Sequence, residues 1–144
     1  MKRPPLWECP SCRRRFANRH QSHTCGKLDL VDHFRGKPPE IRELYDAFVA
    51  LVEACGPVTI LPEKTRIAFQ VRMSFAALMP KQRWVDGHLV LAQRNESPHF
   101  RRIETFSPRN HLHAFRLERI TQLDAGFRKF VRAAYAVGEQ RHLE

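Results

Sequence analysis

Apolar residues recur at two different spacings along this chain, and the change from one to the other separates predicted helices from predicted strands. Between Ile41 and Cys55 they fall three or four residues apart, which is the spacing of one helix face. Pro38-Pro39-Glu40 precedes this stretch, and proline suits a first helical turn because its missing N–H is not needed there. Gly56-Pro57 follows and is typical of a helix end. The pattern predicts an amphipathic helix that begins near Pro39 and ends near Cys55.

The middle of the chain shows alternation and short β-branched runs, which are typical of strands. Ile67, Phe69 and Val71 alternate with small or polar residues, as in a strand with one buried face. Asp86-Gly87 is a common two-residue hairpin turn, so we expect one strand to end before it and another to begin after it. The candidate strand segments are 58–61, 67–71, 73–79, 83–85, 88–92, 100–106 and 112–117.

A second amphipathic helix is predicted from Thr121 to Val137, where Thr121 and Asp124 have the spacing of an imperfect capping box. A helix, a series of strands and another helix indicate an α+β fold. We expect an antiparallel sheet of four to six strands with two helices packed on one face, preceded by a small zinc knuckle. The boundary falls between Gly26 and Pro39, which divides the chain into a segment 1–27 and an α+β domain 28–144.

The cysteines near the N-terminus indicate a metal site. Cys9 and Cys12 form a Cys-x-x-Cys pair, and Cys25 follows closely. Zinc prefers four tetrahedral ligands from thiolate sulfur or imidazole nitrogen. The fourth ligand is His23 or His20, and we prefer His23 because it follows Cys12 at nearly the usual finger spacing. Cys55 lies on the apolar face of the predicted helix, so we interpret it as a buried hydrophobic residue.

A segment of about 25 residues cannot bury enough apolar surface to fold alone, so the metal would supply its folding energy. Four protein ligands leave no open position, which predicts one structural rather than catalytic Zn²⁺. The alternative is a reduced thiol cluster that holds no metal.

The charge of the chain narrows the choice of partners. The net charge is +10, and residues 1–27 contribute +6 of it through seven basic residues and a single acidic one, Glu8. Such a basic protein tends to meet polyanions: nucleic acid, a phosphate-bearing small ligand or an acidic protein. The alternative is that the positive charge reflects a generally arginine-rich composition and indicates no partner, because arginines are spread along the whole chain.

The sequence gives no indication of a membrane protein. Its apolar runs are short, such as 75–79, whereas a membrane-spanning helix needs about 20 apolar residues. The basic start at Lys2 and Arg3 has no apolar stretch behind it, as an export signal would. We expect no membrane association and a cytoplasmic protein.

Several stretches within residues 57–142 resemble an uncharacterised bacterial family, the domain of unknown function 5655. These stretches are Leu61-Pro-Glu-Lys-Thr-Arg-Ile-Ala-Phe69, Met73-Ser-Phe-Ala76, Arg102-Ile-Glu-Thr-Phe-Ser-Pro-Arg-Asn-His-Leu-His113, and Leu123-Asp124 through Ala134-Tyr135. Similar members also carry a short Cys-x-x-Cys segment in front. The resemblance implies no established activity.

Polar and basic side chains gather in two stretches that are candidate binding surfaces, in addition to the basic N-terminal segment. One runs from Glu63 to Arg72, and the other runs from Ser107 to His113 with Arg101, Arg102 and Arg116 nearby. His111 and His113 point to the same side of a strand because strand side chains alternate. Either they belong to a solvated polar face, or they line one phosphate-binding pocket with basic residues, since arginine matches phosphate geometry. Trp84, Phe100 and Phe106 are candidates for stacking on bases, although aromatic residues at strand spacing are more often core. The candidate binding residues are Arg13, Arg14, Arg15, Arg19, Lys64, Arg66, Arg72, Arg109, His111 and His113.

The sequence lacks a glycine-rich phosphate loop, a nucleophile elbow and a zinc-protease helix motif, so it predicts no catalytic residue. The hypothesis that it favours is a nucleic-acid-binding module. One alternative is a small-ligand or protein-interaction module in which zinc is purely structural. A further alternative is a hydrolase or nuclease that uses His111 with Glu63 or Glu104.

Overall fold

The protein is an α+β fold built on a six-stranded antiparallel sheet, as the sequence predicted. The computed structural model describes residues 5–20 and 29–141. Its elements are β1 (Trp7–Glu8), β2 (Arg15–Phe16), a short 3-10 helix (Leu30–His33), α1 (Pro39–Glu53), β3 (Thr59–Pro62), β4 (Ile67–Gln70), β5 (Ser74–Pro80), β6 (Val85–Leu91), β7 (Arg102–Ser107), β8 (Asn110–Leu117), a second 3-10 helix (Ile120–Gln122) and α2 (Ala125–Gly138).

The strand order of the main sheet is β3-β4-β5-β6-β8-β7, and every neighbouring pair is antiparallel. The first four strands follow each other as a meander. After β6 the chain runs through residues 92–101 to the far edge, forms β7 there, and returns as β8 between β7 and β6. Strand β8 therefore lies inside the sheet, and β3 and β7 are its two edges.

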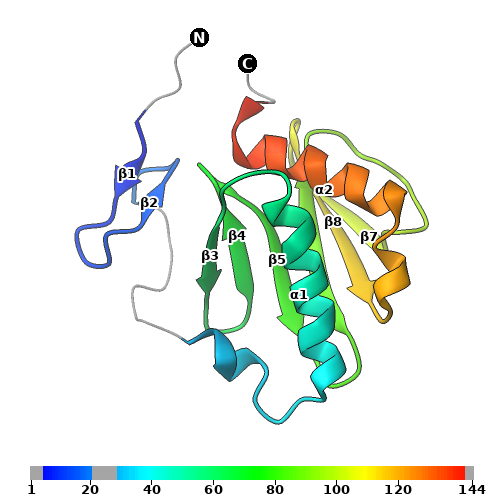
Figure 1. Cartoon of the computed structure of the whole chain (residues 1–144). Coiled ribbons are helices and arrows are strands. Elements are labelled where there is room, and N and C mark those ends of the chain that lie inside the picture. The colour runs from blue at the N-terminus through cyan, green and yellow to red at the C-terminus, as the bar shows by residue number, and fades with distance from the viewer. Residues whose placement is uncertain (1–4, 21–28, 142–144) are drawn as a thin grey trace.

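Both helices cover the same face of the sheet (Figure 1). Phe48 of α1 is fully buried between sheet residues, with ring centroids 5.3 Å from Phe69 and 5.8 Å from Phe115. Phe127 of α2 packs 5.1 Å from Phe115, so this β8 phenylalanine contacts both helices. The apolar stripes of the two helices thus bury one face of the sheet and do not cover the other.

The predicted hairpin turn at Asp86-Gly87 is wrong, because both residues lie inside the continuous strand β6. The turn before β6 is instead closed by the hydrogen bond from the Lys81 N–H to the Trp84 carbonyl, at 2.8 Å. Glycine is needed at position 87 for packing: a Cβ there would lie 2.6 Å from Phe115 Cζ and 2.7 Å from Leu78 Cδ2. The glycine that indicated a turn makes room for the core.

Helix α2 begins later than predicted. Thr121 belongs to the second 3-10 helix, and Asp124 is the residue that caps α2. Its carboxylate accepts the Phe127 N–H at 2.8 Å, which satisfies one of the free donors at the helix start.

Strands β1 and β2 form a small hairpin beside the β3–β4 edge of the main sheet (Figure 1). Between them, the Cys9 N–H donates to the Arg14 carbonyl and the Arg13 N–H donates to the Cys9 carbonyl, both at 2.8 Å. Arg13 has a φ of 67°, in the left-handed region. The Gln70 side chain on β4 donates to the Arg15 carbonyl, which ties this hairpin to the sheet.

Candidate functional site

The sheet face that the helices leave uncovered is crossed by one row of paired residues. Leu61, Ala68, Ala77, His88, Ala114 and Arg102 are register partners, one from each of the six strands. Their neighbours along each strand point to the helices, because strand side chains alternate. Three of the six residues are alanines, so the middle of this face is shallow.

A series of hollows runs from the β5–β6 turn over this face to its β7 edge, and we call the series the basic groove. It consists of three hollows that share residues at their borders: Lys81 and Asp86 join the first to the second, and Arg101 and Arg102 join the second to the third. Their volumes are about 580, 200 and 290 Å³. The basic residues that line the groove are Lys37, Lys81, Arg83, Arg94, Arg101, Arg102 and Arg116.

The first hollow contains an aromatic side chain among the basic ones. Trp84 is held by a hydrogen bond from its indole N–H to Asp86, at 3.2 Å. The Arg116 guanidinium lies 4.0 Å from the centre of the Trp84 ring and pairs with Asp86 at 2.8 Å. Trp84 is thus a fixed, partly exposed ring at the β5–β6 end of the groove.

Positive charge dominates the groove. Asp86 and Glu96 are the acidic residues that line it, against seven basic ones. Glu96 lies 3.8 Å from Arg94, and Glu104 outside the hollows pairs with Arg102 at 3.2 Å. Within residues 5–20 and 29–141, no acidic side chain pairs with the other four cations, which are Lys37, Lys81, Arg83 and Arg101. The groove therefore presents unneutralised charge to a ligand.

The structure does not bring the sequence-predicted binding residues into one pocket. Lys64 is exposed in the turn between β3 and β4, where Arg66 pairs with Glu63 at 2.8 Å. Arg72 follows the other end of β4 and donates to Gln140 at 2.8 Å. Two strands, β5 and β6, separate β4 from the histidines of β8, a distance of about 14 Å. Arg109 is exposed in the β7–β8 turn.

His111 and His113 do share one side of β8, but that side faces the helices and both side chains are buried. The Asn95 N–H donates to His113 Nε2 at 2.9 Å, so His113 Nδ1 carries the proton and donates to the His111 carbonyl at 2.9 Å. His111 contacts the Thr105 hydroxyl at 2.9 Å and the Pro108 carbonyl at 3.1 Å. These contacts fasten the 92–101 loop and the β7–β8 turn.

Acid is expected to destabilise the fold through His113. Burial lowers the pKa of His113 below its ordinary 6.5, and protonation of Nε2 would also break the Asn95 hydrogen bond. The unfolded chain then binds more protons than the folded one below about pH 6.5. The contribution of His113 to the free energy of unfolding is thus greatest above that pH and falls as the pH drops towards 5.

Urea unfolding of the protein and of His113→Gln at pH 7.5 and pH 5 measures this effect. We expect a smaller loss between the two pH values in His113→Gln, whereas His20→Gln, at an exposed position, should keep the full loss. An equal loss in all three proteins would contradict the assignment.

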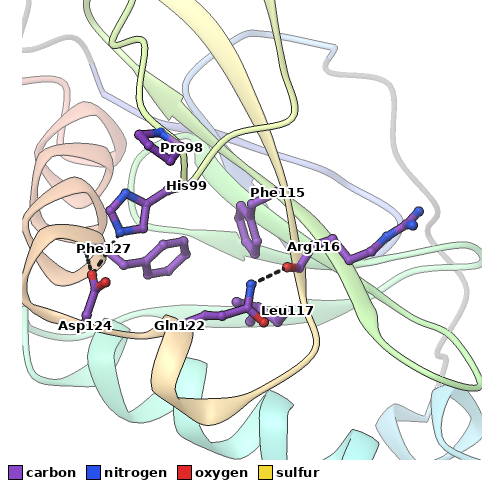
Figure 2. A pocket seen from close by; sticks show the side chains of 8 residues that line it. All are labelled: Pro98, His99, Phe115, Arg116, Leu117, Gln122, Asp124 and Phe127. Atoms are coloured by element: carbon purple, nitrogen blue, oxygen red, sulfur yellow. Dashed lines mark hydrogen bonds and ion pairs between the residues drawn. The ribbon is translucent and has the colours of Figure 1, made fainter.

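A separate cavity of about 320 Å³ lies between the 92–101 loop and the start of α2 (Figure 2). His99 Nε2 donates to Asp124 at 2.9 Å, and the Ser97 hydroxyl contacts His99 Nδ1 at 2.7 Å. The Phe127 N–H and then His99 hold the pKa of Asp124 below its ordinary value. Figure 2 shows the Arg116 side chain pointing away from this pair. The pair fastens the loop to the start of α2.

The described half of the predicted zinc site is a single tight turn. Cys9 is 4% exposed, Cys12 is half-buried, and neither takes part in a disulfide. His20 packs against Trp7, with ring centroids 5.2 Å apart. In the described part of the chain no three histidine, cysteine or acidic side chains gather as a metal site requires, so His20 does not cluster with the two cysteines. His23 and Cys25 lie outside the described residues.

The remaining arginines of the N-terminal hairpin and Cys55 have local roles. Arg13 and Arg15 lie 3.4 and 3.7 Å from Glu8 in exposed pairs. Arg14 is half-buried and Arg19 is exposed. The Cys55 thiol donates to the Leu51 carbonyl at 3.5 Å, and burial raises its pKa.

The sequence placed Arg101, Arg102 and Arg116 beside the predicted His111 surface. It did not group them with the other basic groove residues, because the groove comes from five separate stretches of the chain.

Of the aromatic residues considered for base stacking, Phe106 is 67% exposed at the end of β7. Trp84 lines the first hollow of the groove, and Phe100 lines the third, where its ring is already packed on His113 and Phe130. The cue available in the sequence was the basic run Lys81-Gln82-Arg83 directly before this tryptophan.

These observations define a class: a small α+β domain with a helix-covered antiparallel sheet and a basic groove on the open sheet face. Residues 30–138 match the family described as Domain of unknown function (DUF5655), and the chain belongs to this family. The match includes α1, whereas the sequence resemblance covered residues 57–142. Neither the curated proteins nor the solved structures gave a match to the chain. Neither α1 nor α2 is long and apolar enough to cross a membrane, as judged over the described residues.

Proposed function

We propose that this protein binds nucleic acid along the basic groove. The observation that carries the proposal is the excess of seven basic over two acidic lining residues in three connected hollows. A row of cations spaced along a groove suits a repeating phosphate backbone better than one compact ligand. Trp84 adds a flat aromatic surface at one end, and aromatic rings with nearby cations are a common arrangement for holding unpaired bases.

Fluorescence anisotropy with labelled single- and double-stranded DNA and RNA tests this function. We expect binding at low salt that weakens steeply as salt rises, because each phosphate contact releases counterions. We expect single strands to bind more tightly, since base stacking on Trp84 requires unpaired bases. No binding to any of the four probes at low salt would contradict the proposed nucleic-acid-binding function.

We further propose that the N-terminal segment holds one structural zinc ion through Cys9, Cys12, His23 and Cys25. Two thiols on one tight turn, with cross-turn backbone hydrogen bonds of 2.8 Å, suit half of a tetrahedral site. The packing of His20 on Trp7 favours His23 as the imidazole ligand. Through the Gln70–Arg15 hydrogen bond, a folded segment would add the basic residues Arg13, Arg14 and Arg19 beside the sheet.

Zinc content of the purified full chain checks this site. We expect one zinc per chain in the unaltered protein and in His20→Ala, and a large loss of zinc in Cys9→Ser and His23→Ala. The two histidine variants form a matched pair, because they differ by three positions in the same segment. Zinc lost from His20→Ala but kept by His23→Ala would reverse the ligand assignment, and a metal-free unaltered protein would contradict the site.

A further inference from the structure

His88 occupies an unusual position in the middle of the open sheet face. Its register partners on both sides are alanines, Ala77 on β5 and Ala114 on β8. Small neighbours leave room above them, and the middle hollow of the basic groove, about 200 Å³, is lined by both His88 and Ala114. A water molecule takes up about 30 Å³, so this hollow has room for a small anion together with some of its hydration water.

The walls of this hollow are basic. Arg102 pairs with Ala114 from the other side, and Arg116 lies two residues along β8, on the same face. Lys81 and Arg101 complete the rim. The methyl group of Ala114 is therefore the floor of a small site with a histidine on one side and arginines on the others. We call these four residues, His88, Arg102, Ala114 and Arg116, the anion site.

The imidazole of His88 has no hydrogen-bond partner among residues 5–20 and 29–141, in contrast to His111 and His113. Burial, followed by the positive charges of Arg66 and Arg102, lowers the pKa of His88 to about 4, and Glu104 opposes this shift. His88 is thus a neutral side chain whose ring nitrogens are available to a ligand in the hollow. A bound anion would supply both a hydrogen-bond acceptor and a compensating negative charge.

We propose that the anion site binds one phosphate group, and that His88 takes up a proton when the phosphate binds. As applied to nucleic acid, this rests on the proposed function, because the anion site is the middle of the basic groove. A phosphate oxygen would accept a hydrogen bond from protonated His88, while Arg102 and Arg116 contact the other oxygens.

His88 is the one histidine among the described groups around the anion site, so it is the group that a bound phosphate can bring to titrate above pH 4. The others are five permanent cations and two carboxylates that already pair with arginine, and they come from β6, β7, β8 and the turns between strands. These groups are Arg66, Lys81, Arg101, Arg102, Arg116, Asp86 and Glu104. Proton uptake at His88 therefore makes binding of a phosphodiester, whose own charge is constant, tighter as the pH falls through and below the pKa of the bound state.

The size of the effect follows from linkage. Each unit by which phosphate raises the pKa of His88 corresponds to about a tenfold gain in affinity at acid pH relative to alkaline pH. The gain is absent above the pKa of the bound state, and it grows as the pH falls towards the pKa of the free state.

Nuclear magnetic resonance of the ¹³C,¹⁵N-labelled full chain tests the proposal directly. The ring signals of His88, identified by their loss in His88→Asn, are followed from pH 4 to 8 in chloride, in inorganic phosphate and with a twelve-residue single-stranded DNA, at constant ionic strength. We expect phosphate and DNA each to raise the pKa of His88 by at least about one unit. Ala114→Leu, which fills the floor, should abolish the shift.

The outcomes separate the two proposals. If DNA binds by anisotropy while the pKa of His88 stays the same in all three conditions, the anion site is overturned and the nucleic-acid function stands. If phosphate raises the pKa of His88 but DNA does not bind, the anion site stands and the nucleic-acid function falls. The measurement on the unaltered chain needs no variant to fold.

Discussion

Replacing Arg101 and Arg102 together by glutamate is expected to lower nucleic-acid affinity about 100-fold at low salt and to reduce the salt slope by about 2. These two residues line both the second and the third hollow of the basic groove, so the change reverses the charge where these two hollows meet. Both are exposed, and so the fold should tolerate the substitution. Anisotropy titrations at several salt concentrations give both quantities.

A matched control lies on the other side of the molecule. Arg128 and Lys129 are exposed on α2, and replacing both by glutamate changes the net charge of the protein by the same amount. We expect this variant to lose much less affinity than the Arg101/Arg102 variant. Equal losses in the two variants would mean that net charge alone, and not the groove, determines binding.

Replacing Gly87 by alanine is expected to lower the free energy of unfolding by about 1–3 kcal/mol, and valine should cost more. The new Cβ would collide with side-chain atoms of Phe115 and Leu78 and would lie 2.9 Å from the Ala77 carbonyl oxygen. Because β6 is a central strand, the backbone has little freedom to move away. Urea unfolding of the variants measures the change.

Gly36→Ala is the appropriate comparison for this prediction. Gly36 has a φ of +73° but no atom within 4 Å of an added Cβ, so its replacement introduces backbone strain without a collision. We expect it to cost less than Gly87→Ala. A neutral Gly87→Ala would contradict the close packing of β6 against Phe115 and Leu78.

The sequence predicted the elements of this fold well because their periodicity is strong. The stripe from Ile41 to Val52 indicated α1, and the alternation around Phe69 indicated β4. The hairpin at Asp86-Gly87 was mispredicted because glycine occurs for two different reasons. It favours tight turns, and it also occurs inside a strand where packing leaves no room for a side chain. Distinguishing the two requires knowing that Phe115 lies opposite Gly87 in the next strand.

The binding surface was less predictable, because the sequence does not say which side of each strand faces the helices or which strands are neighbours. Alternation placed His111 and His113 on one side of β8 but did not say which side faces the helices. His88 attracted no attention because its significance depends on Ala77 and Ala114, which lie far from it in sequence. Only the order of the strands brings these residues together with Arg102.

Mapping amide chemical shifts of ¹⁵N-labelled protein during addition of single-stranded DNA tests the central claim most directly. The account predicts that the largest changes occur along the basic groove, at residues 81–88, 94–102 and 114–116, together with the indole N–H of Trp84. The outer faces of α1 and α2 should change little. Changes confined to the helices, or to the N-terminal segment alone, would contradict the claim that the open sheet face binds nucleic acid.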